Sequence, residues 1–262
     1  MTTIVKHELK QGRKALCLWT LGIGALLVVC VFLFPEMKGQ MEGVNDMFAS
    51  MGAFTDAFGM DRLNFGSLVG FYAIECGNIL GLGGAFFAAL CGAAALSKEE
   101  HEHTAEFLLT HPVSRKRVVT EKLIAVLIQV TLLNVLVYAF AGGSIVAIGE
   151  AVPWKELNLL HTAYYFMQLE LAMVCFGMSA FMRKGSAGLG LGLAILMYFL
   201  NLIANITEEV EFLKMISPFG YCEAADIVSD GHLDGPLIGI GAAIALAGIG
   251  MSYLKYTHKD IH

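Results

Sequence analysis

The sequence SKEEHEHTAEFLLTHPVSRKRVVTEK, residues 97–122, is the long charged segment of a chain that is otherwise mostly apolar. Apolar runs long enough to cross a membrane flank it on both sides. Ser97 and Glu100 form a Ser-x-x-Glu capping box, which predicts the start of a helix. Pro112 predicts its end, and Ser114 predicts the cap of the next helix. The segment therefore predicts a short polar helix between two membrane spans.

The composition indicates an integral membrane protein. Of the 262 residues, 56% are hydrophobic and 15% are charged, whereas a soluble domain usually carries about 25% charged residues. The spans leave no room for a sizeable soluble domain, and a net charge of −6 makes nucleic acid an unexpected partner. The six cysteines show no metal or disulfide spacing, so we interpret them as small apolar residues.

Six apolar runs predict an all-α integral membrane protein with one transmembrane domain over residues 1–262. The expected spans are about 16–34, 67–96, 118–148, 159–182, 187–206 and 236–254.

The remaining segments predict short helices at the two membrane surfaces. Residues 1–14 predict a basic amphipathic helix on an anionic inner leaflet. Residues 35–66 predict short amphipathic helices on the outer surface. Residues 207–235 predict two short outer helices, one before and one after Pro218. The third span is expected to tilt or to end irregularly near Gly142 and Gly143.

The positive charges predict the topology. Thirteen of the 17 Lys and Arg residues lie in the N-terminal segment, the 97–122 loop, the 183–186 turn and the C-terminal tail. The other four lie in the segments on the opposite side. Cytoplasmic loops of membrane proteins carry an excess of Lys and Arg. We therefore expect a multi-pass protein of the cell membrane with both termini in the cytoplasm.

Residues 104–115, TAEFLLTHPVSR, carry a resemblance to a known family. With Glu99 and Glu100 before them and Lys122 after them, they resemble the signature of ABC exporter permeases of the ABC-two membrane type. Six spans, a basic N-terminal helix and a Ser-Pro-Phe segment before the last span are similar to that family as well. The family often has Gly before the Thr, where this chain has His103.

The resemblance implies that the 97–117 loop holds a coupling helix, which docks into a groove on a separate ATP-binding cassette ATPase subunit. It also implies a second permease subunit, identical or related, and export driven by ATP hydrolysis. The docking residues implied are Glu99, Glu100, Thr104, Glu106, Phe107, Leu108, Leu109 and Arg115.

The chain itself is not expected to be an enzyme. It has no GxxxxGK[ST] phosphate-binding loop, so ATP and Mg are expected in the partner subunit and no cofactor in this chain. No catalytic arrangement of side chains stands out. His101, His103 and His111 lack the spacing of a metal site, so no metal is expected.

Polar residues within the spans are the other candidates. Glu170 falls near the middle of the fourth span, close to Gln168, and either lines a substrate path or is a buried structural acid. Asn134, Asn201 and Asn205 are expected to form hydrogen bonds between helices.

Two alternatives from other classes remain, an ion-gradient-driven secondary carrier and an intramembrane enzyme that uses Glu170 and the histidines. Co-purification distinguishes them, because only the ABC permease requires a bound ATPase.

Overall fold

The computed structural model describes residues 3–39, 62–101, 113–182 and 186–259, together with residues 52, 55, 57, 58 and 60. Every regular element in this part of the chain is a helix. The long helices are α1 (Thr3–Lys38), α8 (Arg115–Ala147), α9 (Trp154–Ser179), α10 (Ser186–Ile206) and α12 (Gly235–His258). The shorter ones are α4 (Leu68–Cys76), the π-helix η1 (Gly77–Leu82), α5 (Gly83–Ala95), α6 (Lys98–His101), the 3₁₀-helices η2 (Glu208–Met215) and η3 (Gly220–Cys222), and α11 (Ala224–Asp230).

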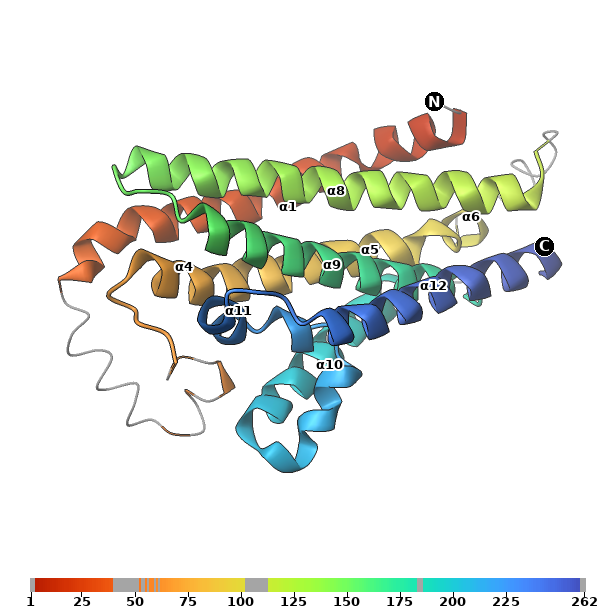
Figure 1. Ribbon diagram of the computed structural model, residues 1–262. Helices are drawn as coiled ribbons and strands as arrows, with labels where there is room; N and C mark the ends of the chain where they lie inside the picture. Colours follow the sequence, from red (N-terminus) through yellow and green to blue (C-terminus); the bar gives the residue numbers. More distant parts are fainter. Residues whose placement is uncertain are drawn as a thin grey trace.

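The long helices form one elongated bundle (Figure 1). The continuous rod α4–η1–α5 counts as one of them, and successive rods run in opposite directions. Both chain ends and α6 lie at one end of the bundle, which we call the terminal end. The end of α1 and the start of α4 lie at the other, which we call the distal end, and α11 lies toward it. One ion pair at each end joins α1 to another segment of the same chain. Glu8 pairs with Lys122 of α8 at the terminal end, and Lys38 pairs with Glu150, just after α8, at the distal end. Each N–O distance is 3.0 Å.

Five helical segments are long and apolar enough to cross a membrane within the described residues. They are Thr3–Lys38, Leu68–Ala95, Arg115–Ala147, Ala187–Ile206 and Gly235–His258. The helix α9 is not among them. It carries His161, Gln168 and Glu170, and all three are buried against other helices. Its main neighbours are α5 on one side and α12 on the other, so α9 is a central helix of the bundle.

Glycines bring these neighbours close to α9. A Cβ atom on Gly92 of α5 would lie 2.2 Å from the carbonyl oxygen of Ala172. A Cβ atom on Gly177 of α9 would lie 2.6 Å from the carbonyl oxygen of Gly248 of α12. Only glycine permits such an approach, and small residues of this kind are typical of contacts between membrane helices. The backbones of α5, α9 and α12 therefore touch directly.

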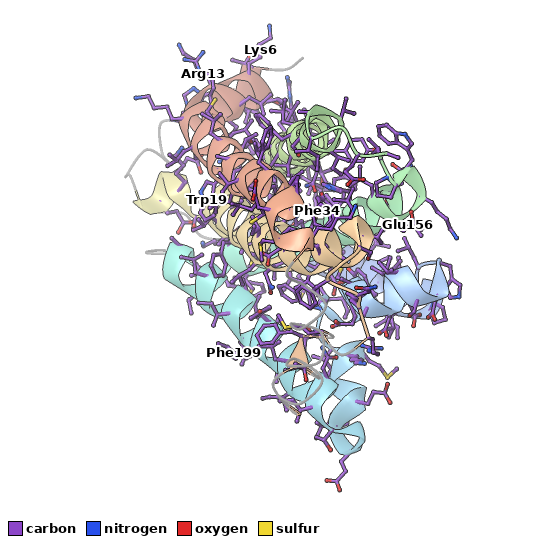
Figure 2. The ribbon with its side chains drawn as sticks, turned by 90° about the vertical axis from the view of Figure 1, so that its left-hand side faces the viewer. Lys6, Arg13, Trp19, Phe34, Glu156 and Phe199 are labelled. Atoms are coloured by element: carbon purple, nitrogen blue, oxygen red, sulfur yellow. The ribbon has the colours of Figure 1, made fainter. Side chains whose placement is uncertain are left out.

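The structure corrects the sequence prediction at the N-terminus. Residues 1–14 and 16–34 were expected to form a surface helix and a separate span, but α1 is one continuous helix. No glycine or proline separates the basic residues from the apolar run after Lys14, so nothing ends the helix there. Lys6 and Arg13 point away from the bundle (Figure 2), whereas Phe34 is fully buried.

The ends of α8, α9 and α12 differ less from the predicted boundaries of the spans. The expected irregular turn near Gly142 and Gly143 is wrong, because α8 continues to Ala147. The chain turns at Gly149, whose φ of 79° lies in the left-handed region that favours glycine. Helix α12 reaches His258, one turn beyond the expected end of the last span, and α9 begins at Trp154 within the expected loop.

Two local predictions are confirmed. The Ser114 side chain accepts a hydrogen bond from the Arg117 N–H at 3.3 Å and caps α8. Short helices lie on both sides of Pro218, namely η2 before it and η3 and α11 after it. The expected helices of residues 35–66 lie largely outside the described residues, as do residues 102–112 and therefore Pro112.

Candidate functional site

Helix α6 begins the charged loop and is fastened to the bundle by a buried lysine. The Lys122 side chain of α8 is 1% exposed and pairs with Glu99 of α6 and with Glu8 of α1, the latter at 3.0 Å. Its Nζ also donates a hydrogen bond to the Ala95 carbonyl at 2.7 Å. Three strong acceptors satisfy the three N–H groups of the ammonium. Lys122 therefore ties α1, α6 and the end of α5 to α8.

A second buried lysine fastens α6 to the C-terminal end of the chain. Lys259 follows α12, and its Nζ lies 2.7 Å from Glu100 Oε1. The same Nζ donates to the Met182 carbonyl, after α9, at 2.9 Å. Arg115 donates to the carbonyls of Thr257 and Lys259 and so holds the same tail against α8. We call Lys122, Lys259, Glu8, Glu99, Glu100 and Arg115 the α6 clamp.

The start of α1 has a separate attachment beside the clamp. Glu121 is 4% exposed and accepts a hydrogen bond from the Ile4 backbone N–H at 3.2 Å. Its other oxygen pairs with Arg117 Nε at 2.7 Å. A carboxylate at a helix N-terminus suits both the unpaired N–H groups and the positive end of the helix dipole. The first turn of α1 is therefore held against α8.

Three of the predicted docking residues have partners within this chain, and their docking to an ATPase stays a prediction. Glu99, Glu100 and Arg115 were expected to face a partner, but each contacts another part of this chain. The other predicted docking residues, Thr104, Glu106, Phe107, Leu108 and Leu109, lie outside the described residues. At the expected cap, the Ser97 hydroxyl donates to the Ala93 carbonyl at 3.0 Å, and α6 begins at Lys98.

Sequence reasoning missed the roles of Glu8 and Lys259. Glu8 is the acidic residue of a basic N-terminal segment, and this departure from the local charge pattern was a usable signal. Lys259 lies in a short polar tail and gave no comparable signal. Removing one partner of a buried ion pair typically costs about 3–5 kcal/mol, because the other charge stays buried and unpaired.

The structure does not bring the two candidate substrate-path residues together. Gln168 is fully buried and its Oε1 accepts a hydrogen bond from Asn134 Nδ2 of α8 at 2.7 Å. Glu170 accepts from the Tyr221 hydroxyl of η3 at 2.8 Å. Two positions along a helix differ by about 200°, so the two side chains point to different neighbours. Gly241 of α12 leaves room for Glu170, since a Cβ there would lie 2.2 Å from Glu170 Oε2.

Other polar side chains of α9 also find partners on neighbouring helices. His161 Nε2 lies 2.7 Å from the Tyr72 hydroxyl of α4, and the Tyr165 hydroxyl lies 2.9 Å from the Thr131 hydroxyl of α8. These pairs satisfy polar groups that lipid would leave unsatisfied. Together with Gln168 and Glu170 they fix the rotation of α9 within the bundle.

The predicted interhelical asparagines divide into two groups. The prediction is confirmed for Asn134 of α8, which donates a hydrogen bond to Gln168 of α9. Asn205 of α10 also bonds to other segments, since it donates to Glu223 at 2.7 Å and to the Ala57 carbonyl at 3.1 Å. Asn201 is 6% exposed, and its Oδ1 has no partner among the described residues. No group of three His, Cys, Asp or Glu residues able to hold a metal occurs in the described part of the chain.

A comparison with curated proteins found no match. A protein-family model described as "ABC-2 family transporter protein" matches residues 2–258, almost the whole chain. Members of this family are the membrane components of transporters that work with an ABC ATPase, and they are not themselves catalytic. With its several long apolar helices and this match, the chain is a multi-pass membrane protein that belongs to the ABC-2 family of transporter permeases.

Proposed function

We propose that the chain is the permease subunit of an ATP-binding cassette exporter, driven by a separate ATP-binding subunit that docks at residues 97–117. The observation that carries this proposal is the α6 clamp. The few residues of α6 are joined by buried charges to α1, α8 and the ends of α9 and α12. A movement of this loop is thereby passed to four long helices. A transporter driven by an ATPase at the cytoplasmic surface requires such a connection.

The lengths of α1 and α8 support this position. At 1.5 Å per residue, the 36 residues of α1 span about 54 Å and the 33 residues of α8 about 50 Å. The hydrocarbon core of a bilayer is about 30 Å thick. The charged segments Lys6–Lys14 of α1 and Arg115–Lys122 of α8 lie at the terminal end. In our proposal this end projects into the cytoplasm, where an ATPase can reach it.

We propose six spans, with α9 as the fourth and both termini in the cytoplasm. Helix α9 has 26 residues, enough to cross the hydrocarbon core, and its neighbours shield its polar side chains. A second permease subunit, identical or related, would form the membrane channel together with this chain. ATP and Mg would bind to the partner ATPase rather than to this chain.

The first prediction concerns docking. In the double variant Phe107→Ala/Leu108→Ala the permease should insert normally but lose its ATP-binding subunit. Truncation of an interface hot spot costs about 2 kcal/mol or more, so docking should weaken by more than about tenfold. The measurement is recovery of the ATPase on tagged permease, together with its stimulated hydrolysis rate.

A matched control for this variant is Phe212→Ala/Met215→Ala. These two apolar side chains are exposed on η2, which lies away from α6 (Figure 1) and outside the cell in our topology, so their loss should leave recovery unchanged. Normal recovery and normal hydrolysis with the Phe107/Leu108 variant would refute docking through this segment.

The second prediction concerns the clamp. Lys259→Gln should leave the ATPase bound but reduce transport, because α6 is then no longer tied to α12 and to the end of α9. Lys255→Gln, one turn earlier and exposed, is the control and should transport normally. The measurement is transport per recovered ATPase in proteoliposomes. Full transport by folded Lys259→Gln permease would show that this ion pair carries no coupling.

The third prediction concerns topology. Single cysteines at residues 209 and 230, placed in a background without native cysteines, should react with an impermeant thiol reagent added outside intact cells. A single cysteine at residue 116 should react only after the cells are opened. Labelling of residue 116 in intact cells would contradict the proposed orientation.

The fourth prediction concerns Glu170, which we propose as a residue of the substrate path. Glu170→Gln should alter transport or its pH profile more than it lowers the melting temperature, because the amide still accepts the Tyr221 hydrogen bond. Tyr221→Phe is the companion variant, which removes the same hydrogen bond and keeps the carboxyl. A lower melting temperature with unchanged transport in Glu170→Gln would assign Glu170 a structural role.

A further inference from the structure

A small cavity lies toward the distal end of the bundle, away from the α6 clamp. Its volume is about 60 Å³, enough for a few water-sized guests. Most of its lining is apolar, and its polar residues are Asn78 of η1, Tyr164 of α9, Asn201 and Tyr198 of α10, and Glu223 just before α11. Both Asn201 and Glu223 are more than nine-tenths buried.

One amide oxygen of a residue that lines this cavity, and a second outside the lining, lack hydrogen-bond partners among the described residues. Asn201 Oδ1 is buried and has no hydrogen-bond partner among the described residues, and the same holds for Asn205 Oδ1 one turn along α10. Asn205 Nδ2 donates to Glu223 Oε2 at 2.7 Å. An orphaned buried acceptor is costly unless a donor or a cation approaches it. The arrangement therefore points to a guest that is positive or donates hydrogen bonds.

Charged groups of both signs lie near Glu223. Arg62 pairs with Asp226 of α11, and Lys214 of η2 lies 3.8 Å from Glu211. Burial raises the pKa of the Glu223 carboxyl, the Asn205 hydrogen bond lowers it, the neighbouring Asp226 raises it and the charges of Arg62 and Lys214 lower it. A carboxylate in such a place is stabilised by a bound cation.

The local backbone is shaped to leave this space open. The cavity borders the π-helix η1, which interrupts the α-helical rod at Gly77. A Cβ atom on Gly77 would lie 2.8 Å from the Tyr164 hydroxyl. Short π-helical turns within α-helices occur frequently at functional sites. Glycine at this position keeps the phenol beside the cavity.

We propose that this cavity binds one monovalent cation, Na⁺ or K⁺, between the Glu223 carboxylate and the Asn201 amide oxygen. Glu223 is the one carboxylate among the residues that line the cavity, and the other oxygens come from neutral amides and phenols. This donor set compensates a single positive charge. Ca²⁺ sites draw on several carboxylates, and Mg²⁺ keeps several of its waters, for which 60 Å³ leaves little room. The bound ion would join α10, η1 and the segment before α11.

The test uses the purified full-length permease without its ATPase, so its result is independent of the proposed transport function. The melting temperature is measured in choline chloride, NaCl and KCl at equal ionic strength. A ligand that binds only the folded state raises this temperature in a saturable way. We expect a rise of several degrees with Na⁺ or K⁺ relative to choline.

Two variants assign the effect to the cavity. Glu223→Gln should abolish the cation-dependent rise, and Asp230→Asn, which removes an acidic charge from the end of α11 outside the cavity, should retain it. If Glu223→Gln does not fold, Asn201→Ala gives the same readout with the carboxylate in place. Equal melting temperatures in all three salts would mean that the cavity holds only water and would overturn the proposal. A rise that persists in the folded Glu223→Gln or Asn201→Ala protein would overturn it as well.

Discussion

Lipid offers no hydrogen bonds to a polar side chain, and this constraint decides the place of α9 in the bundle. Its His161, Gln168 and Glu170 are buried and each contacts a partner on a neighbouring element. The surrounding helices are more apolar, and α10 and α12 present many exposed apolar side chains outward. Glycines let α5 and α12 close tightly over α9. The bundle therefore encloses the polar side chains of α9.

Buried polar groups also have partners at the terminal end of the bundle. Two lysines that are almost fully buried, Lys122 and Lys259, each hold a carboxylate of α6. Buried ion pairs contribute little net stability compared with apolar packing, but they fix which elements lie together. In our proposal this specificity is their use, because the loop that meets the ATPase must move as one piece with α1, α8 and α12. The Glu170 contact with Tyr221 and the cavity at Glu223 are separate from this clamp.

The sequence predicted the helical class, the positions of most long helices and the Ser114 cap, because these follow from apolar length and local capping chemistry. It misplaced the start of α1, because a basic amphipathic pattern followed by an apolar run looks the same whether or not the helix is continuous. A hydropathy threshold also misses α9, although His161, Gln168 and Glu170 each contact a partner distant in the chain. The inward pairing of Glu99 and Glu100 was not predictable for the same reason. Glu99 and Lys122 are 23 positions apart in the sequence, and Glu100 and Lys259 are 159 positions apart.

The central claim is that the terminal end of the bundle receives the ATP-binding subunit at α6. Electron cryomicroscopy of the permease in a lipid nanodisc with its ATPase measures this directly. We expect ATPase density against residues 97–117, outside the lipid disc and at the same end as both termini. Density of the ATPase at the distal end beside α11, or a stable ATPase complex that leaves the 97–117 segment uncovered, would contradict it.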